Sequence, residues 1–146
     1  MYQDALRQWQ HAAAEFLKTV ENIPYERRQV VGVCGAWSIQ QIVAHLAGWQ
    51  REALRRYQEC LAGDTTSRTY DLDAFNASSV AALKLLNWYE TLDTFRFTFE
   101  DLNKKAQQLT ETQLSQTPVY EEWLTGIGND LVEHTTQIVK WLAAQE

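Results

Sequence analysis

The chain has 146 residues, of which 45% are apolar, and this length fits a single domain, residues 1–146, with a sizeable core. Its net charge of −6 opposes binding to nucleic acid, which needs a basic face on the protein. No apolar run approaches the roughly 18 residues that a membrane span requires, and the opening stretch MYQDALRQWQ lacks a signal-peptide core, so we expect a cytoplasmic protein without nucleic-acid or membrane partners.

A first long helix is predicted from Tyr2 to about Asn22, because apolar residues recur there every three or four positions. Pro24 follows closely and marks the turn beyond the helix end. In the connector after it lies Cys34, which, like Cys60, is expected to be a free thiol in a reducing cytosol. The apolar stripe consists of Tyr2, Leu6, Trp9, Ala13, Phe16 and Val20.

A second long helix begins after a strong start signal. Ser38 is a good N-cap, Gln41 completes a capping box, and Trp37 can pack on Ile42 as a hydrophobic staple. Gly63 ends the helix. The apolar stripe consists of Ile39, Ile42, Leu46, Trp49 and Ala53, with Leu54, Tyr57 and Leu61 close beside it. The charged residues predicted to point away from the core are Arg51, Glu52, Arg55, Arg56 and Glu59.

A short helix and a third long helix follow in the second half of the chain. The short helix is predicted from about Leu72 or Asp73 to Leu86. A capping box of Asn87 and Glu90 then starts the third long helix. Its apolar stripe is the most regular in the chain and consists of Trp88, Leu92, Phe95, Phe99, Leu102, Ala106 and Leu109.

A fourth long helix comes after a polar connector, residues 110–119, which has room for one helical turn before Pro118. Its stripe consists of Leu124, Ile127, Leu131, His134, Ile138 and Trp141. Four long helices of similar length, with one short extra helix between the second and the third, predict an all-α four-helix bundle.

His134 occupies a position on the last helix that the spacing reserves for an apolar residue. A buried polar ring without a partner costs on the order of 1–3 kcal/mol, so His134 must be hydrogen-bonded or metal-bound. Asp130 lies one turn earlier on the same helix face and forms a ready pair with it. The simplest interpretation is that Asp130 only accepts a hydrogen bond from His134.

His45 lies at the shoulder of the second helix's stripe, one turn after Ile42 and one turn before Trp49. Helix bundles build metal sites from side chains on facing helices. Two imidazoles and one carboxylate are a recognised ligand set for zinc, iron(II), nickel or manganese, with open positions for water or substrate. His45, Asp130 and His134 are therefore the candidate metal ligands. A partly exposed His45 in a metal-free protein is the equally open alternative.

Four further side chains carry weaker signals. Trp49 and Trp141 could wall a pocket above the group, although core aromatics are the commoner case at helical spacing. Cys34 precedes the second helix, whose N-terminus could lower the thiol pKa and make it a nucleophile; a small loop cysteine is more often inert. Glu133 faces another direction from His134 and is expected to be solvated, or to support the ligands from outside their set, and not to act as a base. No phosphate-binding loop, Ser/His/Asp order or CxxC motif is present, so no catalytic residue is assigned.

Two stretches far apart in the chain carry a family resemblance. Trp37-Ser38-x5-Ala44-His45-Leu46-x2-Trp49, with Asp130-x3-His134-x2-Gln137-Ile138, resembles the DinB-like superfamily of four-helix bundles. Asp73-Ala74-Phe75-Asn76-Ala77 and Glu133-His134-x2-Gln137-Ile138-x2-Trp141 resemble its DfsB-type branch, which includes proteins related to self-resistance against a genotoxic natural product. The resemblance spans essentially the whole chain, with the motifs in the right order.

The resemblance implies a down-up-up-down bundle, often dimeric, with a divalent metal ion held by three histidines. One histidine comes from the second helix and two come from the last, spaced i and i+4. His45 matches the first and His134 matches the third. Asp130 stands at the remaining position, and a carboxylate is a competent ligand there, although some relatives have lost the metal.

We therefore expect a homodimer that binds a divalent metal ion and acts as a metal-dependent hydrolase or a thiol-dependent transferase on small reactive molecules. The metal ion would lower the pKa of a bound water or polarise the substrate. Two alternatives remain open. One is a metal-free protein that binds or sequesters a small molecule in an aromatic-lined pocket, and the other is a structural homodimer with a degenerate metal site.

Overall fold

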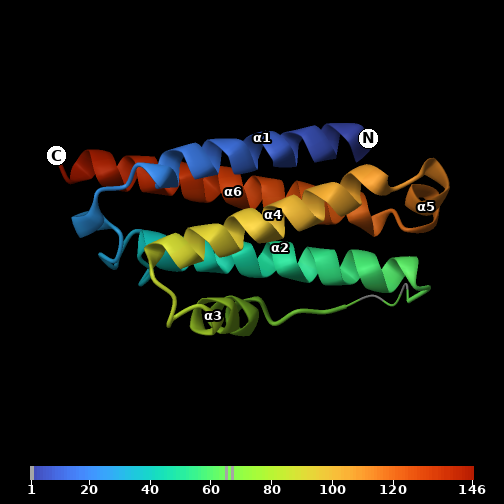
Figure 1. The fold of residues 1–146 in the computed structure, drawn as a ribbon, viewed down its shortest axis with the longest axis horizontal. Coiled ribbons are helices and arrows are strands. Elements are labelled where there is room, and N and C mark those ends of the chain that lie inside the picture. The colour runs from blue at the N-terminus through green and yellow to red at the C-terminus, as the bar shows by residue number, and fades with distance from the viewer. Residues whose placement is uncertain (1, 65, 67) are drawn as a thin grey trace.

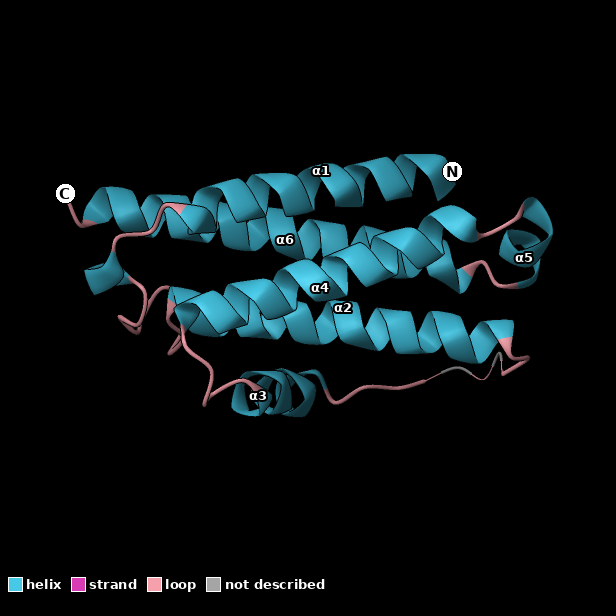
Figure 2. Cartoon of the chain, in the orientation of Figure 1, coloured by secondary structure: helices cyan, strands magenta, loops and turns pink. Residues whose placement is uncertain are grey.

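The computed structural model describes residues 2–64, 66 and 68–146, which form helices joined by loops and turns (Figure 1, Figure 2). Within them lie six α-helices, one 3-10 turn and no β-strand, which confirms the all-α class; Cys34 and Trp37 pair only as an isolated antiparallel bridge. The helices are α1 (Tyr2–Glu21), α2 (Ile39–Leu61), α3 (Leu72–Ala82), α4 (Trp88–Gln108), α5 (Glu111–Gln116) and α6 (Val119–Ala144), with the 3-10 turn η1 at Tyr25–Arg27.

The four long helices, α1, α2, α4 and α6, run lengthwise beside one another (Figure 1). α1 packs along α6 and α2 packs along α4, while α2 also contacts α6 and so joins the two pairs. None of the helices in the described residues is both long and apolar enough to cross a lipid bilayer. The largest fully buried side chains come from the predicted stripes and from their flanks: Trp9, Phe16, Ile39, Ile42, Leu46, Tyr57, Phe95, Leu102, Tyr120, Leu124, Leu131 and Ile138.

Side-chain caps set several helix starts. The predicted capping boxes at the starts of α2 and α4 are both present. A third box, in which Thr110 and Gln113 cap each other, was not predicted and extends the expected single turn to the six residues of α5. α3 ends at Ala82, before the predicted Leu86, because the chain leaves this helix through tight i→i+3 turns to reach Asn87 in the extended conformation that caps α4.

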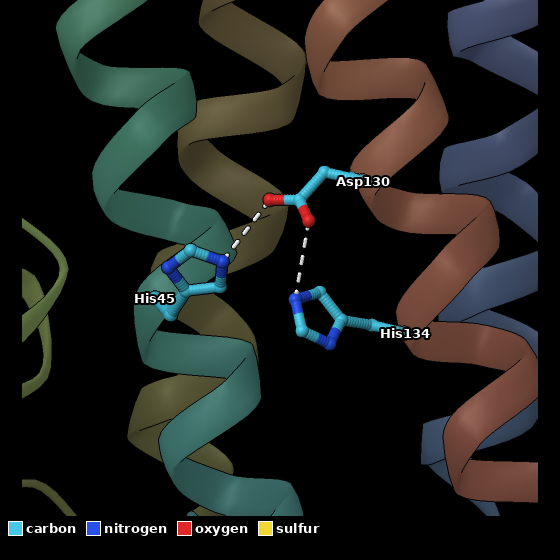
Figure 3. Close-up of side chains that lie close together, drawn as sticks. All are labelled: His45, Asp130 and His134. Atoms are coloured by element: carbon cyan, nitrogen blue, oxygen red, sulfur yellow. Dashed lines mark hydrogen bonds and ion pairs between the residues drawn. The ribbon is translucent and has the colours of Figure 1, made fainter. Parts of the chain in front are cut away.

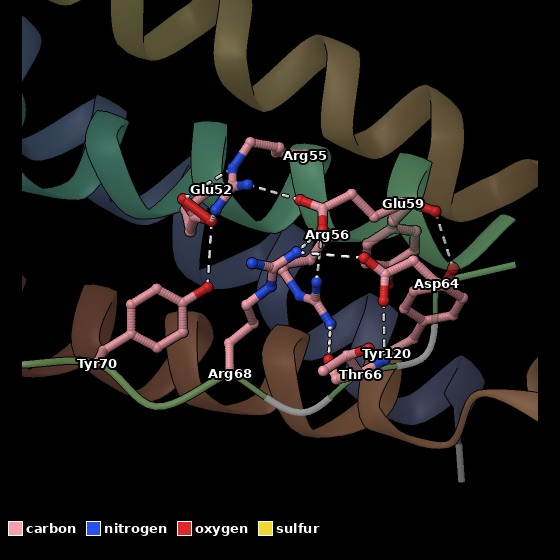
Figure 4. Close-up of polar contacts among 10 residues, drawn as sticks. Glu52, Arg55, Arg56, Glu59, Asp64, Thr66, Arg68, Tyr70 and Tyr120 are labelled. Carbon is pink, nitrogen blue, oxygen red and sulfur yellow. Dashed lines mark hydrogen bonds and ion pairs between the residues drawn. The ribbon is translucent and has the colours of Figure 1, made fainter. Parts of the chain in front are cut away.

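Two charged residues of α2 are buried, which corrects the prediction that they point away from the core. Glu52 is 8% exposed and Arg56 is 4% exposed. Thr66 and Tyr70, which follow α2 in the chain, lie against this helix beside them (Figure 4). Arg56 donates hydrogen bonds to Glu59 at 2.8 Å and to the Thr66 carbonyl oxygen at 2.6 Å, and the Tyr70 hydroxyl donates to Glu52 at 3.1 Å. Each buried charge thus has a partner, as its desolvation requires.

α3, seen nearly end-on in Figure 1, contacts α2 at a point of very close approach. Gly48 allows this approach, because a Cβ atom there would lie 2.2 Å from Ser79 Oγ and 2.4 Å from Ser79 Cβ. Beside it, the Trp49 ring packs at a tilt against Phe75 with ring centroids 4.2 Å apart, and its Nε1 donates to Asn76 Oδ1 at 2.7 Å. These contacts hold α3 over the part of α2 that carries the predicted site.

Candidate metal centre

The three predicted ligands, His45, Asp130 and His134, lie together (Figure 3). His45 comes from α2, while Asp130 and His134 are one turn apart on α6, so the α2–α6 contact brings them into one place. His45 Nε2 lies 3.0 Å from Asp130 Oδ2, and His134 Nε2 lies 3.2 Å from Asp130 Oδ1. The two imidazole rings meet edge to face with centroids 5.1 Å apart. Both histidines therefore direct Nε2 at one carboxylate.

The group is buried on its histidine side and more open on its carboxylate side. The side chains of His45 and His134 are 4% and 6% exposed, whereas that of Asp130 is 31% exposed. Burial raises the pKa of Asp130, but hydrogen bonds from His134 and His45 outweigh it and hold the pKa below its usual value. Burial lowers the pKa of His134, but the hydrogen bond to Asp130 outweighs it and raises the pKa above its usual value. Without a metal ion, Asp130 is thus ionised and His134 is readily protonated.

Neighbouring side chains orient both imidazoles. Gln137 Oε1 lies 2.8 Å from His134 Nδ1, and a carbonyl oxygen accepts from an N–H, so Nδ1 carries a proton. The proton that Nε2 donates to Asp130 in the metal-free protein is the one that a metal ion would displace. The Trp37 ring packs on the His45 ring with centroids 4.9 Å apart. His45 Nδ1 is buried and has no hydrogen-bond partner among the described residues.

The donor set fits a divalent metal ion. One ligand atom from each of the three side chains can be chosen so that all lie within 4.8 Å of one another. Ligand atoms in a tetrahedral zinc site, each about 2.1 Å from the metal, are roughly 3.4 Å apart. The separations of 3.0 Å to His45 and 3.2 Å to His134 are of this size, and each ends on a different oxygen of the carboxylate. Two imidazoles and a carboxylate with an open side also suit iron(II).

An open cavity of about 480 Å³ lies against the three side chains. Trp37 and Trp49 form an apolar wall of this cavity, while Asn76 and Asn129 contribute polar groups. Trp49 therefore lines a pocket as predicted. Trp141 does not line this cavity and packs, partly buried, against the core.

Cys34 and Glu133 also line the cavity. Cys34 is a free thiol, as is Cys60. Its pKa is raised and not lowered: burial is the largest cause, and the carboxylates of Glu133 and Asp130 add to it. The hypothesis of a nucleophile activated by the helix N-terminus is therefore wrong for the metal-free protein. Glu133 is exposed, as predicted for a solvated side chain.

A larger hollow, of about 610 Å³, lies between η1 and the start of α4. Its main feature is the Arg28 guanidinium, which lies 5.1 Å from the centroid of the Trp88 ring and 5.4 Å from that of Tyr89. The group of side chains in the described residues that could hold a metal ion lies at the smaller cavity. We therefore place the candidate chemistry at the smaller one.

Two functional neighbours were missing from the predicted ligand set. Gln137 follows His134 by three residues on a helix, a spacing that brings side chains into contact and could have indicated the hydrogen bond. Trp37 was predicted only as a staple on Ile42. Trp37 precedes the N-cap Ser38 and lies outside the helix, whereas His45 lies within it. The spacing rules for residues of one helix therefore do not predict their contact.

Comparison with known protein families gives one match. A family model described as the DinB superfamily matches residues 8–138, which include all three candidate ligands. No curated protein and no solved structure matches the chain.

Proposed function

Because this chain belongs to the DinB superfamily, which often binds metal, we propose that it holds a divalent metal ion through His45, Asp130 and His134. One observation carries the proposal: two buried histidines direct Nε2 at the two oxygens of a single carboxylate, at 3.0 and 3.2 Å, beside an open cavity. Zinc, nickel, iron(II) and manganese are the candidate ions.

A bound divalent ion would supply Lewis acidity, which polarises a substrate or lowers the pKa of water. The chain's own residues have separate tasks. Gln137 holds the proton of His134 on Nδ1 and keeps the ring in its orientation. Trp37 and Trp49 exclude water from one wall and offer a flat apolar surface to the substrate. Glu133, exposed at the cavity, adds negative charge beside the three candidate ligands.

The activity we propose is that of a metal-dependent hydrolase or a thiol-dependent transferase acting on small reactive molecules. The resemblance to the DfsB-type branch supports this activity. The proposal includes a down-up-up-down four-helix bundle, supported by the packing of α1 on α6 and of α2 on α4. It also includes a homodimer in the cytoplasm. The two free cysteines suit that compartment, because thiols stay reduced there.

A metal-free binding protein is the second candidate, and a specific observation favours it. Asp130 already accepts a hydrogen bond from each histidine, so the three side chains satisfy one another without a metal ion. The cavity beside Trp37 and Trp49 would then bind or sequester a small molecule. In the other alternative, a structural homodimer with a degenerate metal site, the same three residues only satisfy one another.

Metal analysis of protein purified without added metal separates the candidates. We expect about one divalent ion per chain. Added zinc or nickel should raise the melting temperature of chelator-treated protein, since binding at 100 times Kd contributes about 2.7 kcal/mol. His45→Ala should abolish this rise, whereas His11→Ala, at an exposed histidine of α1, should keep it. Absence of copurified metal, with no response to zinc or nickel, would contradict the metal proposal.

A further inference from the structure

The hollow of about 610 Å³ between η1 and the start of α4, here called the Arg28 hollow, has no role in the proposed function. Its volume falls within the roughly 300–1,000 Å³ that is usual for small-molecule sites. Three aromatic side chains line it, of which Trp88 is buried while Tyr25 and Tyr89 are exposed. The hollow therefore offers aromatic surface that a ligand can reach from solvent.

Arg28 is fixed in this hollow through its backbone, its Nε atom and its guanidinium plane. The Arg28 carbonyl oxygen accepts from the Gln40 N–H, at the start of α2, at 3.1 Å. Arg28 Nε donates to the Ile23 carbonyl oxygen at 3.1 Å. The guanidinium carbon lies over all three aromatic rings, 5.1 to 5.8 Å from their centroids. Because the side chain is already ordered, it loses little conformational entropy when a ligand binds to it.

The Arg28 guanidinium keeps hydrogen-bonding capacity that the chain does not use. Its Nη1 and Nη2 atoms have no acceptor among the described residues, and none of the carboxylates described there forms an ion pair with it. By contrast, Arg56 is paired with Glu59 at 2.8 Å. Arg28 is only half-buried, so a ligand can reach it. Two amino groups in one plane match the two oxygens of a carboxylate.

The charges that line the Arg28 hollow favour a ligand with a single negative charge. Within the described part of the chain, Arg28 is the only cationic side chain of the lining and Glu26 is the only anionic one. A carboxylate is balanced by one guanidinium. A dianion such as a phosphate monoester would keep one unbalanced charge and would be repelled more strongly by Glu26.

We infer that the Arg28 hollow binds a small carboxylic acid as its monoanion, with the carboxylate on Nη1 and Nη2 of Arg28 and an aromatic body against Tyr25 and Tyr89. None of the three candidate metal ligands lines this hollow. The inference therefore goes beyond the proposed function and needs no metal ion.

Three probes of one skeleton test the inference: 3-phenylpropionate, 3-phenylpropan-1-ol and 3-phenylpropylamine, which are anionic, neutral and cationic. Each is titrated into the chelator-treated whole chain, so that no carboxylate binds through a metal ion, and the amide and indole N–H signals of Trp88 and Tyr89 are followed by NMR. We expect the acid to bind at least about tenfold more tightly than the alcohol or the amine, because charge-assisted hydrogen bonds contribute at least this factor. Equal affinity for acid and alcohol would overturn the inference.

Replacing Arg28 tests whether its guanidinium holds the acid. Arg28→Gln should weaken 3-phenylpropionate at least about tenfold and leave the alcohol unchanged. Arg28→Lys keeps the charge but not the planar pair of amino groups, and should weaken the acid by about threefold. The control, Arg51→Gln, removes the same charge from an exposed position of α2 and should bind the acid as the parent does. Equal losses in Arg28→Gln and Arg51→Gln would indicate a general charge effect and overturn the inference.

Glu26→Gln tests the same site without changing Arg28 or its contacts. It removes the exposed carboxylate that lines the hollow and should tighten 3-phenylpropionate by about two- to fivefold. The matched control is Glu15→Gln, at an exposed position of α1, which should leave the affinity as in the parent. If both variants bind the acid equally, the ligand does not lie beside Glu26 and the inference is wrong.

Zinc titration of the same preparations keeps this inference apart from the proposed function. Protein that binds zinc but shows no preference for the acid would contradict the inference alone. Protein that binds the acid through Arg28 but takes up no divalent ion would contradict the metal proposal and support the inference.

Discussion

Replacing Asp130 with asparagine tests how much the hydrogen-bonded group stabilises the metal-free protein. The carboxylate accepts from His45 Nε2 at 3.0 Å and from His134 Nε2 at 3.2 Å, and both rings are buried. Asparagine has one acceptor oxygen, so its NH₂ must face one of these donors and leave it without a partner. Such a loss costs about 1–3 kcal/mol. In chelator we expect the free energy of unfolding to fall by about 2 kcal/mol, equivalent to roughly 6 °C in melting temperature.

Urea and thermal melts, followed by circular dichroism with chelator and with zinc, measure this effect. Asp101→Asn, at an exposed position of α4, is the matched control and should change the free energy by less than about 0.5 kcal/mol. If Asp130→Asn is as stable as the parent in chelator, the hydrogen bonds provide no net stability. An unchanged zinc affinity would remove Asp130 from the ligand set.

The loss of stability should also depend on pH, measured in chelator. The pKa of Asp130 is lowered in the folded protein, so its contribution is present above an unfolded-state pKa of about 4 and is lost as the pH falls. The pKa of His134 is raised, so its contribution is present below an unfolded-state pKa of about 6.5 and is lost as the pH rises through the folded-state value. The difference between parent and variant should therefore be largest between these limits. A difference that grows steadily toward alkaline pH would refute the reasoning.

Three other substitutions test separate contacts. Asp130→His introduces the histidine that the family resemblance implies and should tighten nickel binding at least about tenfold in competition with a chelating dye; weaker binding would count against the site. Gly48→Ala should lower the free energy of unfolding by about 1–3 kcal/mol despite alanine's helix propensity, because its Cβ would lie 2.2 Å from Ser79 Oγ; adding Ser79→Gly should restore most of it in urea melts. Arg56→Ala should cost about 1–3 kcal/mol, whereas Arg51→Ala, exposed on the same helix, should cost less than about 0.5 kcal/mol by the same melts.

The sequence alone was sufficient to predict the long helices, because the signals that define them act between residues close together in the chain. Apolar spacing of three and four predicted the buried faces of α1 and α4, and the capping boxes of Ser38 and Asn87 predicted where α2 and α4 start. Both kinds of signal act between residues within a turn of each other. The end of α3 was less predictable, because it depends on how the chain turns to reach the next cap.

Part of the candidate site could also be predicted from spacing within one helix. Asp130 and His134 face each other because they are four residues apart on one helix, and that spacing was enough to pair them. The position of His45 depends on how α2 rotates and slides against α6. That His45 joins Asp130 was therefore a hypothesis until the packing of the two helices was known. The structure places its Nε2 3.0 Å from Asp130 Oδ2.

The tertiary structure decided the electrostatics. Glu52 and Arg56 carry the sequence pattern of a solvated helix face, yet both are buried, and they bond to Tyr70 and Thr66, which follow α2 in the chain. The pKa of the Cys34 thiol is raised mainly by burial, and also by Glu133 and Asp130, which α6 places close to it although they lie almost a hundred residues away in sequence. Helix formation follows from neighbours along the chain, but burial and pKa depend on which groups the packing brings close, and that information is not local.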